Sequence, residues 1–265
     1  NMVKITYKKL LAQKKIQPIT CLTAYTKSIA KILDGKIDLI LIGDSLGTVL
    51  YGMKNTQSVS LQMIKAHGKA VVQQVNNSIT IIDMPYKTYR NKKEALKNAK
   101  NILNYTKADF IKLETNNKNV AIVKYLTKNK IDVVGHIGVT PQKFSNFNKI
   151  KSVGKTLQEE KNLLSLASKL ENAGAKFIVL ECIKLRVAKK ITNVLDIPTI
   201  GIGSSKYCDG QVLVINDLLY QDYKEPKLKF VKKYSNLNKI IEKAIKKFAK
   251  EVKIKKFPSK NYSYL

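Results

Sequence analysis

The sequence lacks tryptophan and contains only two arginines, Arg90 and Arg186, among 49 basic residues, so the other 47 are lysines. Proteins that read nucleic acids use arginine for bidentate contacts with bases and aromatic side chains for stacking. The net charge of +30 therefore predicts a dispersed, solvated lysine surface and no specific nucleic-acid partner. A basic nucleic-acid-binding protein is the alternative from another functional class.

Long apolar runs and paired cysteines are also missing. No apolar stretch approaches the roughly 20 residues needed to span a bilayer. Residues 1–15 contain no apolar signal core, so we expect a cytoplasmic protein with no membrane partner. The three cysteines, Cys21, Cys182 and Cys208, are widely spaced and form no CxxC pair. Their odd number argues against a disulfide framework.

The sequence alternates short apolar runs with amphipathic segments. The runs are too short and too uniformly apolar for surface helices, and they are typical of strands buried on both faces. We expect strands at 19–22, 37–42, 79–82, 110–113, 133–137, 177–180, 199–202 and 212–215. We expect helices at about 26–33, 60–75, 92–105, 120–127, 159–173 and 188–194, and loops at 43–58 and 141–155. This count predicts an α/β fold, a single-domain (β/α)8 TIM barrel over residues 1–265 with an N-terminal cap at 1–17.

Residues 236–265 differ from the rest and predict a terminal helix and tail. One stripe at helical spacing is apolar, and lysines fill the opposite face. The stripe consists of Leu237, Ile240, Ile241, Ala244, Ile245, Phe248, Ala249 and Val252. We expect this amphipathic helix to pack on the barrel or on a neighbouring subunit, and this expectation outweighs membrane binding.

Ionisable side chains stand at the ends of five predicted strands: Asp44, Asp83, Glu114, His136 and Glu181. Because the carboxyl ends of barrel strands converge on one mouth, these side chains should meet there. Several carboxylates with few histidines and no cysteine cluster suit a hard cation such as Mg²⁺, which prefers oxygen ligands. In the alternative interpretation each carboxylate caps a helix or forms a surface ion pair, and Asp44 caps the next helix.

Lys112 lies two residues before Glu114, so both side chains should project from the same face of their strand. An inward lysine beside a metal-binding carboxylate would suit the carboxylate of a substrate. The alternative is a surface lysine whose stem lies along apolar neighbours. The spacing alone leaves both interpretations open.

Seven motifs occur in a characteristic order. They are GDSLG at 43–47, DMPY at 83–86, KLE at 112–114, GHIGVTPQ at 135–142, LEC at 180–182, IPTIGIG at 197–203 and CDGQVLV at 208–214. In this order and spacing the chain resembles the ketopantoate hydroxymethyltransferase family. The resemblance extends from about Ile19 to the terminal FPSKNYSY, which is essentially the whole chain.

The resemblance implies an enzyme of pantothenate synthesis. It would transfer a one-carbon unit from 5,10-methylenetetrahydrofolate to 3-methyl-2-oxobutanoate, with one Mg²⁺ per subunit. A 2-oxo acid can chelate Mg²⁺ through its keto and carboxylate oxygens, and the metal would then stabilise negative charge on the enolate. The resemblance also implies a large ring-like homo-oligomer, with a decamer as the expected form.

The family motifs also imply roles for individual residues of this chain. The Mg²⁺ ligands would be Asp44 and Asp83, with Glu114 close to or in the metal shell. The substrate-binding residues would be Asp44, Ser45, Asp83 and Lys112. Glu181 would accept the proton, and His136 is the possible auxiliary residue and the rival base. A lyase or mutase of the related pyruvate-using barrels is the alternative enzyme, although GHIGVTPQ and LEC favour the hydroxymethyltransferase.

Overall fold

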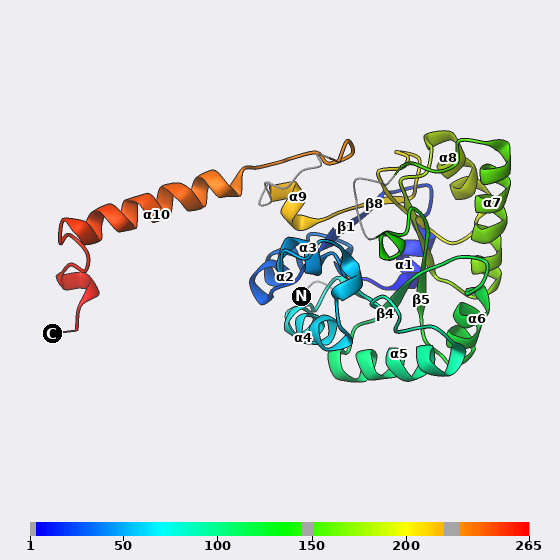
Figure 1. The fold of residues 1–265 in the computed structure, drawn as a ribbon, viewed down its shortest axis with the longest axis horizontal. Helices are drawn as coiled ribbons and strands as arrows, with labels where there is room; N and C mark the ends of the chain where they lie inside the picture. The colour runs from blue at the N-terminus through cyan, green and yellow to red at the C-terminus, as the bar shows by residue number, and fades with distance from the viewer. Residues whose placement is uncertain (1–3, 145–150, 220–227, 265) are drawn as a thin grey trace.

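Eight parallel strands close into a barrel in the computed structural model, which describes residues 4–144, 151–219 and 228–264 (Figure 1). Their order around the barrel is their order in the chain, and β1 pairs with β8. The strands are β1 Ile19–Thr23, β2 Leu39–Ile42, β3 Ile79–Asp83, β4 Phe110–Glu114, β5 Val133–Gly138, β6 Phe177–Glu181, β7 Thr199–Ile202 and β8 Gly210–Leu213. The predicted TIM barrel is confirmed.

Helices connect most of the strands and cover the outside of the barrel (Figure 1). They are α1 Tyr7–Ala12, α2 Lys27–Leu33, α3 Leu46–Val49, α4 Leu61–Val72, α5 Lys92–Thr106, α6 Val120–Lys128, α7 Leu157–Asn172, α8 Leu185–Val194, α9 Ile215–Leu219 and α10 Leu237–Lys253. Short 3-10 turns are η1 Thr56–Ser58, η2 Pro141–Lys143 and η4 Lys260–Tyr262. Side chains of Thr26, Ser60, Asn91 and Thr156 accept a backbone N–H three residues later and so begin α2, α4, α5 and α7.

Alternate strand residues point into the barrel. The inward apolar cluster contains Leu10 of α1 together with Ile19, Cys21, Leu39, Leu41, Ile79, Ile81, Phe110, Val134, Phe177, Val179, Ile200 and Val212. The intervening strand residues, such as Ile40, Ile82 and Ile111, pack against the helices. Side chains alternate along a strand. On each strand, the inward residue that comes after this cluster therefore lies at the carboxyl-terminal mouth of the barrel.

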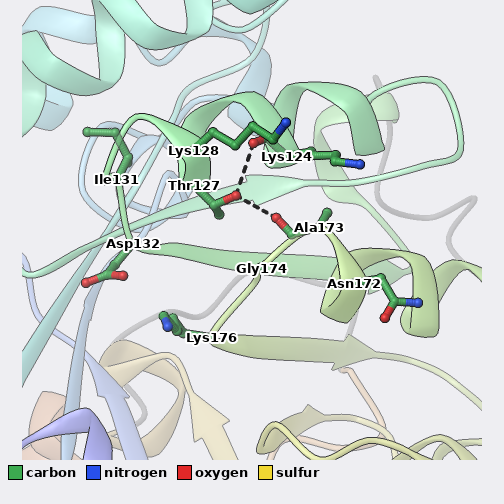
Figure 2. Close-up of a pocket in the computed structure, with 9 residues that line it drawn as sticks. All are labelled: Lys124, Thr127, Lys128, Ile131, Asp132, Asn172, Ala173, Gly174 and Lys176. Atoms are coloured by element: carbon green, nitrogen blue, oxygen red, sulfur yellow. Dashed lines mark hydrogen bonds between the residues drawn. The ribbon is translucent and has the colours of Figure 1, made fainter.

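The amino-terminal end of the barrel is closed by α1. Leu10 is fully buried, and the ring of Tyr7 lies 5.3 Å from that of Phe177 and 6.2 Å from that of Phe110, centroid to centroid. Near this end, a cavity of about 390 Å³ lies between the ends of α6 and α7 (Figure 2). Asp132 and Lys176 line it and directly precede β5 and β6, so this cavity lies away from the carboxyl-terminal mouth.

Some predicted elements differ from the structure in their bounds or in their kind. The eighth strand runs from Gly210 to Leu213, whereas Ile215 begins α9 and its N–H donates to the hydroxyl of Thr23. Gly210 pairs with Ile19, and a Cβ at this glycine would approach the Ile19 carbonyl oxygen to 2.4 Å. The predicted loop at 43–58 contains α3 and η1, which are too short to show a helical period. Part of the predicted 141–155 loop, residues 145–150, lies outside the described residues.

The terminal helix α10 forms as predicted but leaves both of its faces exposed. None of its residues is buried, and Figure 1 shows the helix extending away from the barrel. Ile240, Ile245 and Phe248 are each more than half exposed. The expectation that α10 packs on the barrel of its own chain is therefore wrong. Within the described ranges, no helix combines the length and apolarity needed to cross a membrane.

Candidate active site

The inward positions at the carboxyl ends of β3 to β6 carry ionisable side chains. Inward positions recur every second residue along a strand. Steps of two from the inward apolar residues lead from Ile81 to Asp83, from Phe110 to Lys112 and Glu114, from Val134 to His136, and from Val179 to Glu181. The strand register pairs Asp83 with Lys112, Glu114 with His136, and Gly138 with Glu181. The barrel therefore brings together residues that lie up to about a hundred positions apart, as the strand-end pattern predicts.

Asp83 and Lys112 form a buried ion pair. Lys112 Nζ donates to Asp83 Oδ1 at 2.5 Å, and the backbone N–H of Asp44 donates to Asp83 Oδ2 at 3.0 Å. Burial opposes the charged amine, but the carboxylates of Asp83 and Asp44 outweigh it and raise the pKa of Lys112 above its usual value. Lys112 is thus an inward, charged residue and not a surface lysine.

Asp44 follows β2 and is 8% exposed. Its Oδ2 accepts a hydrogen bond from Gln142 Nε2 at 2.7 Å. Burial and the neighbouring Asp83 raise the pKa of Asp44 to about 7. The alternative that Asp44 caps the next helix is wrong, because Ser45 occupies the N-cap position of α3 and makes no capping bond through its side chain.

Ser45 projects a hydroxyl that is already oriented by a neighbour. Its Oγ lies 2.7 Å from the hydroxyl of Tyr25, a residue that follows β1 and is 2% exposed. Burial raises the pKa of the Tyr25 phenol above its usual value, so Tyr25 keeps its proton and can act as a donor or an acceptor. Tyr25 was not among the residues predicted for the site.

Glu114 is linked to the 3-10 turn η2. The backbone N–H of Gln142 donates to both carboxylate oxygens of Glu114, at 3.0 and 3.2 Å. Burial and Asp44 raise the pKa of Glu114 well above its usual value. Gln142 was not singled out from the sequence, although it is the last residue of the GHIGVTPQ motif.

Glu181 and His136 face each other from adjacent strands. His136 Nε2 lies 3.1 Å from Glu181 Oε2, but the two are not aligned as a hydrogen bond. Among the residues that the structure describes, neither ring nitrogen of the buried histidine has a hydrogen-bond partner. The Glu181 side chain is 15% exposed, compared with 3% for that of Asp83. A Cβ at Gly138, whose φ is +102°, would approach the Glu181 carbonyl oxygen to 2.2 Å, so this strand end requires glycine.

The donor set fits a hard cation held by few protein ligands. Among the residues that the structure describes, the carboxylates of Asp44, Asp83, Glu114 and Glu181 share the mouth with one buried ammonium group, that of Lys112. The raised pKa of Asp44 has burial as its largest cause and the neighbouring carboxylate of Asp83 as its second. In the described residues, no three His, Cys, Asp or Glu side chains are already gathered to enclose a metal. Mg²⁺ typically takes one or two carboxylates and fills its other positions with water or substrate, so the two aspartates fit it.

Comparisons with solved structures agree with the barrel architecture. The chain superposes on phosphonopyruvate hydrolase with a TM-score of 0.63 and 11% identity, covering 100% of this chain and 92% of that one. It superposes on 2,3-dimethylmalate lyase, a member of the PEP mutase/isocitrate lyase superfamily, with a TM-score of 0.61, 11% identity and coverages of 97% and 87%. At such low identity these similarities establish the fold alone.

Sequence comparisons are more specific. The family model described as ketopantoate hydroxymethyltransferase matches residues 4–260. The chain is 49% identical over 254 residues to a 3-methyl-2-oxobutanoate hydroxymethyltransferase of Pelagibacter ubique, covering 96% of this chain and 97% of the relative. It is 40% identical over 264 residues to the enzyme of the same name from Rhizobium etli, with coverages of 98% and 96%. With matches of this extent, the chain belongs to the ketopantoate hydroxymethyltransferase family.

Proposed function

We propose that this protein transfers a hydroxymethyl group from 5,10-methylenetetrahydrofolate to 3-methyl-2-oxobutanoate, giving ketopantoate for pantothenate synthesis. Family membership and the names of the relatives support the acceptor and the reaction class. The observation that carries the proposal is the buried group of Asp44, Asp83 and Lys112 at the barrel mouth, with Glu181 among the same strand ends. This group suits the enolisation of a 2-oxo acid.

Asp44 and Asp83 would hold one Mg²⁺, with Glu114 beside or in its shell. When bound, Mg²⁺ would supply a Lewis acid that polarises the keto oxygen of the acceptor. Asp83 is held on one side by Lys112 and on the other by the N–H of Asp44, so its position is set before any ligand enters. The Gln142 amide fixes Asp44 in the same way.

Ser45 and Lys112 would hold the carboxylate of the acceptor. An ammonium group has three donors, and the Lys112–Asp83 bond uses one of them, so two remain for a substrate. The Ser45 hydroxyl can donate to a substrate oxygen while it accepts from Tyr25. Both residues lie beside the aspartates, which would place the carboxylate and the keto group of a 2-oxo acid on the same side of the mouth.

Glu181 would remove the proton from C3 of the acceptor. Of the mouth carboxylates described above, Asp44, Asp83 and Glu114 each accept a side-chain or backbone hydrogen bond at their carboxylate oxygens. Within the described part of the chain, the contact given for the Glu181 carboxylate is with the unaligned His136 ring at 3.1 Å, and the Glu181 side chain is more exposed than that of Asp83. The proton would pass from C3 to the Glu181 carboxylate. Water would hydrolyse the C–N bonds of the folate methylene group, releasing tetrahydrofolate and a formaldehyde equivalent. The C3 carbanion would add to that carbon, and the oxygen from water would take up a proton to become the hydroxyl group of the product.

The direct test is an assay of 3-methyl-2-oxobutanoate consumption. We expect turnover only when 5,10-methylenetetrahydrofolate and Mg²⁺ are both present. Parallel reactions with phosphonopyruvate and 2,3-dimethylmalate test the alternative enzyme class, which shares this barrel fold. Turnover of either compound, without turnover of 3-methyl-2-oxobutanoate, would contradict the proposal.

The pKa of Asp44 predicts how the metal-free protein responds to pH. Its folded-state pKa of about 7 is above the ordinary 3.8, so the folded state binds the proton more tightly than the unfolded state. The resulting stability is present below about pH 4 and is lost as pH rises through 7. Asp44→Asn should therefore raise the free energy of unfolding relative to wild type at pH 8, by up to about 4 kcal/mol, and much less at pH 4.

This prediction can be checked by thermal or denaturant unfolding in the presence of a chelator. Added Mg²⁺ should stabilise the wild-type protein at pH 8 but not the Asp44→Asn variant, because the variant lacks one carboxylate ligand. If the free energies of unfolding of variant and wild type differ by the same amount at pH 4 and at pH 8, the charge of Asp44 is not the cause of the difference.

We also infer that the protein is a homo-oligomer, with a decamer as the expected form, in which α10 packs on a neighbouring subunit. The apolar stripe of this helix is exposed in the single chain, with Ile245 60% and Phe248 56% accessible. Ile245→Asp with Phe248→Asp should reduce the molar mass measured by light scattering. Lys246→Asp with Lys247→Asp alters charge on the same helix and should leave the mass unchanged. Unaltered mass in the first pair would contradict the inference.

A further inference from the structure

Gln142 uses its backbone to connect two parts of the barrel mouth. It lies on η2, is 3% exposed, and donates its N–H to the carboxylate of Glu114 at the end of β4. Its carbonyl oxygen accepts a hydrogen bond at 2.9 Å from the side chain of Gln57, which lies on η1 between β2 and α4. The backbone of Gln142 is therefore fixed on both sides by partners far away in the sequence.

The side-chain amide of Gln142 is fixed as well. Its Nε2 donates to Asp44 Oδ2 at 2.7 Å and to the carbonyl oxygen of Met84 at 3.0 Å. Its Oε1 accepts from the hydroxyl of Tyr89. A backbone carbonyl can only accept, so Met84 requires the NH₂ group on this side, and Oε1 must then face Tyr89. Burial raises the pKa of Tyr89 above its usual value, which keeps the phenol protonated as a donor.

One uncharged residue thus contacts two of the mouth carboxylates. The amide of Gln142 reaches Asp44 and its N–H reaches Glu114, although these carboxylates follow different strands, β2 and β4. A lysine or arginine in this place would neutralise the carboxylates and compete with a cation. A neutral donor orients them and leaves their negative charge available.

We propose that Gln142 is a positioning residue whose side-chain amide sets Asp44 for a divalent cation, and that Tyr89 fixes the direction of this amide. The inference rests on the proposed function, since it assumes that Asp44 serves the metal. A purely structural role, in which Gln142 only anchors η2 to the barrel, would require the backbone bonds but not the amide. The two roles can be separated because different atoms perform them.

The experiment measures Mn²⁺ binding to the complete protein, without folate or 2-oxo acid, by the loss of the free-ion electron paramagnetic resonance signal. Gln142→Met keeps the volume and both backbone bonds but removes the amide. We expect this variant to bind Mn²⁺ roughly 10–100-fold more weakly than wild type, the usual effect of losing a group that orients a metal ligand. Tyr89→Phe should weaken binding less, by about 3–10-fold, because the amide keeps its contacts with Asp44 and Met84.

Two further variants make the result specific. Tyr89→Phe should add no further weakening in the Gln142→Met background, because the phenol acts through the amide. Gln57→Ala removes the partner of the Gln142 carbonyl and is the matched control for anchoring of η2. It should lower the unfolding temperature while leaving the Mn²⁺ dissociation constant within about two-fold of wild type.

Asp44→Asn separates this inference from the proposed function. Wild-type affinity in Gln142→Met, with affinity lost in Asp44→Asn, would overturn the positioning role and leave the metal assignment in place. Equal Mn²⁺ binding by wild type and Asp44→Asn would overturn both the positioning role of Gln142 and the assignment of Asp44 to the metal. Additive effects of Gln142→Met and Tyr89→Phe would overturn the part assigned to Tyr89.

Discussion

Replacement of Glu181 by glutamine is expected to slow the exchange of the C3 hydrogen of 3-methyl-2-oxobutanoate with solvent by roughly 10²-fold or more, the typical effect of removing a general base. Glutamine keeps the shape of the side chain but cannot accept the proton. Mg²⁺ and the 2-oxo acid should still bind, because Asp44, Asp83 and Lys112 are unchanged. Proton nuclear magnetic resonance in deuterium oxide, without folate, measures this exchange directly.

His136→Asn is the matched variant for this experiment. His136 Nε2 lies 3.1 Å from Glu181 Oε2, so the histidine is close enough to serve as the base itself or to orient the glutamate. We expect His136→Asn to retain most of the exchange, because the carboxylate that accepts the proton is still present. Exchange at the wild-type rate in Glu181→Gln, together with its loss in His136→Asn, would assign the role of base to His136.

The lack of a folate requirement makes the exchange experiment selective. Slow overall turnover could arise from poor folate binding, from slow carbon transfer or from slow product release. Hydrogen exchange at C3 requires only the acceptor, the cation and the base, so it isolates the step assigned to Glu181. An effect on turnover without an effect on exchange would place Glu181 in a later step.

The positions of Asp83, Glu114 and Glu181 could be predicted because they depend on two simple regularities. Apolar runs show where strands are, and alternation along a strand carries the inward direction from Ile81 to Asp83 and from Val179 to Glu181. Closure of the barrel then gathers the strand ends at one mouth. An error of one or two residues at a strand boundary, as at the start of β2, changes neither regularity.

Gln142 and Tyr25 could not be predicted in the same way. Both lie beyond strand ends, where the backbone has no period, and their partners are distant: Gln142 bonds to Asp44, 98 positions away, and Tyr25 to Ser45, 20 positions away. The motif GHIGVTPQ contains Gln142, but a motif does not show which way an amide faces. That direction depends on Met84 and Tyr89, which approach only in the folded barrel.

Helix α10 illustrates the same limit in a different form. Its apolar spacing correctly predicts a helix, because the period is a local property of the chain. The surface against which that stripe packs is not a local property. The chain by itself leaves the stripe exposed, and this is why its contact with a neighbouring subunit is a separate proposal with its own test.

Asp83→Asn is expected to preserve the barrel and to abolish metal-dependent activity, with a loss of roughly 10²–10³-fold or more. Asparagine keeps an oxygen that can accept the N–H of Asp44, so the strand end should retain its shape. It removes the negative charge that pairs with Lys112 and that would bind the cation. Circular dichroism should report an intact fold. After metal has been removed with a chelator, titration of the variant with Mg²⁺ should fail to restore turnover.

Asp109→Asn is the control. Asp109 also flanks a strand of the barrel, but it lies at the amino-terminal end, opposite to the mouth. It directly precedes β4, pairs with Lys4 at 2.7 Å and accepts a hydrogen bond from the N–H of Thr80. Asparagine there should lower the stability by about 1 kcal/mol, as expected for a lost hydrogen bond, and should leave turnover and Mg²⁺ dependence close to wild type. Wild-type turnover in Asp83→Asn after chelation and Mg²⁺ titration would show that Asp83 does not hold the cation.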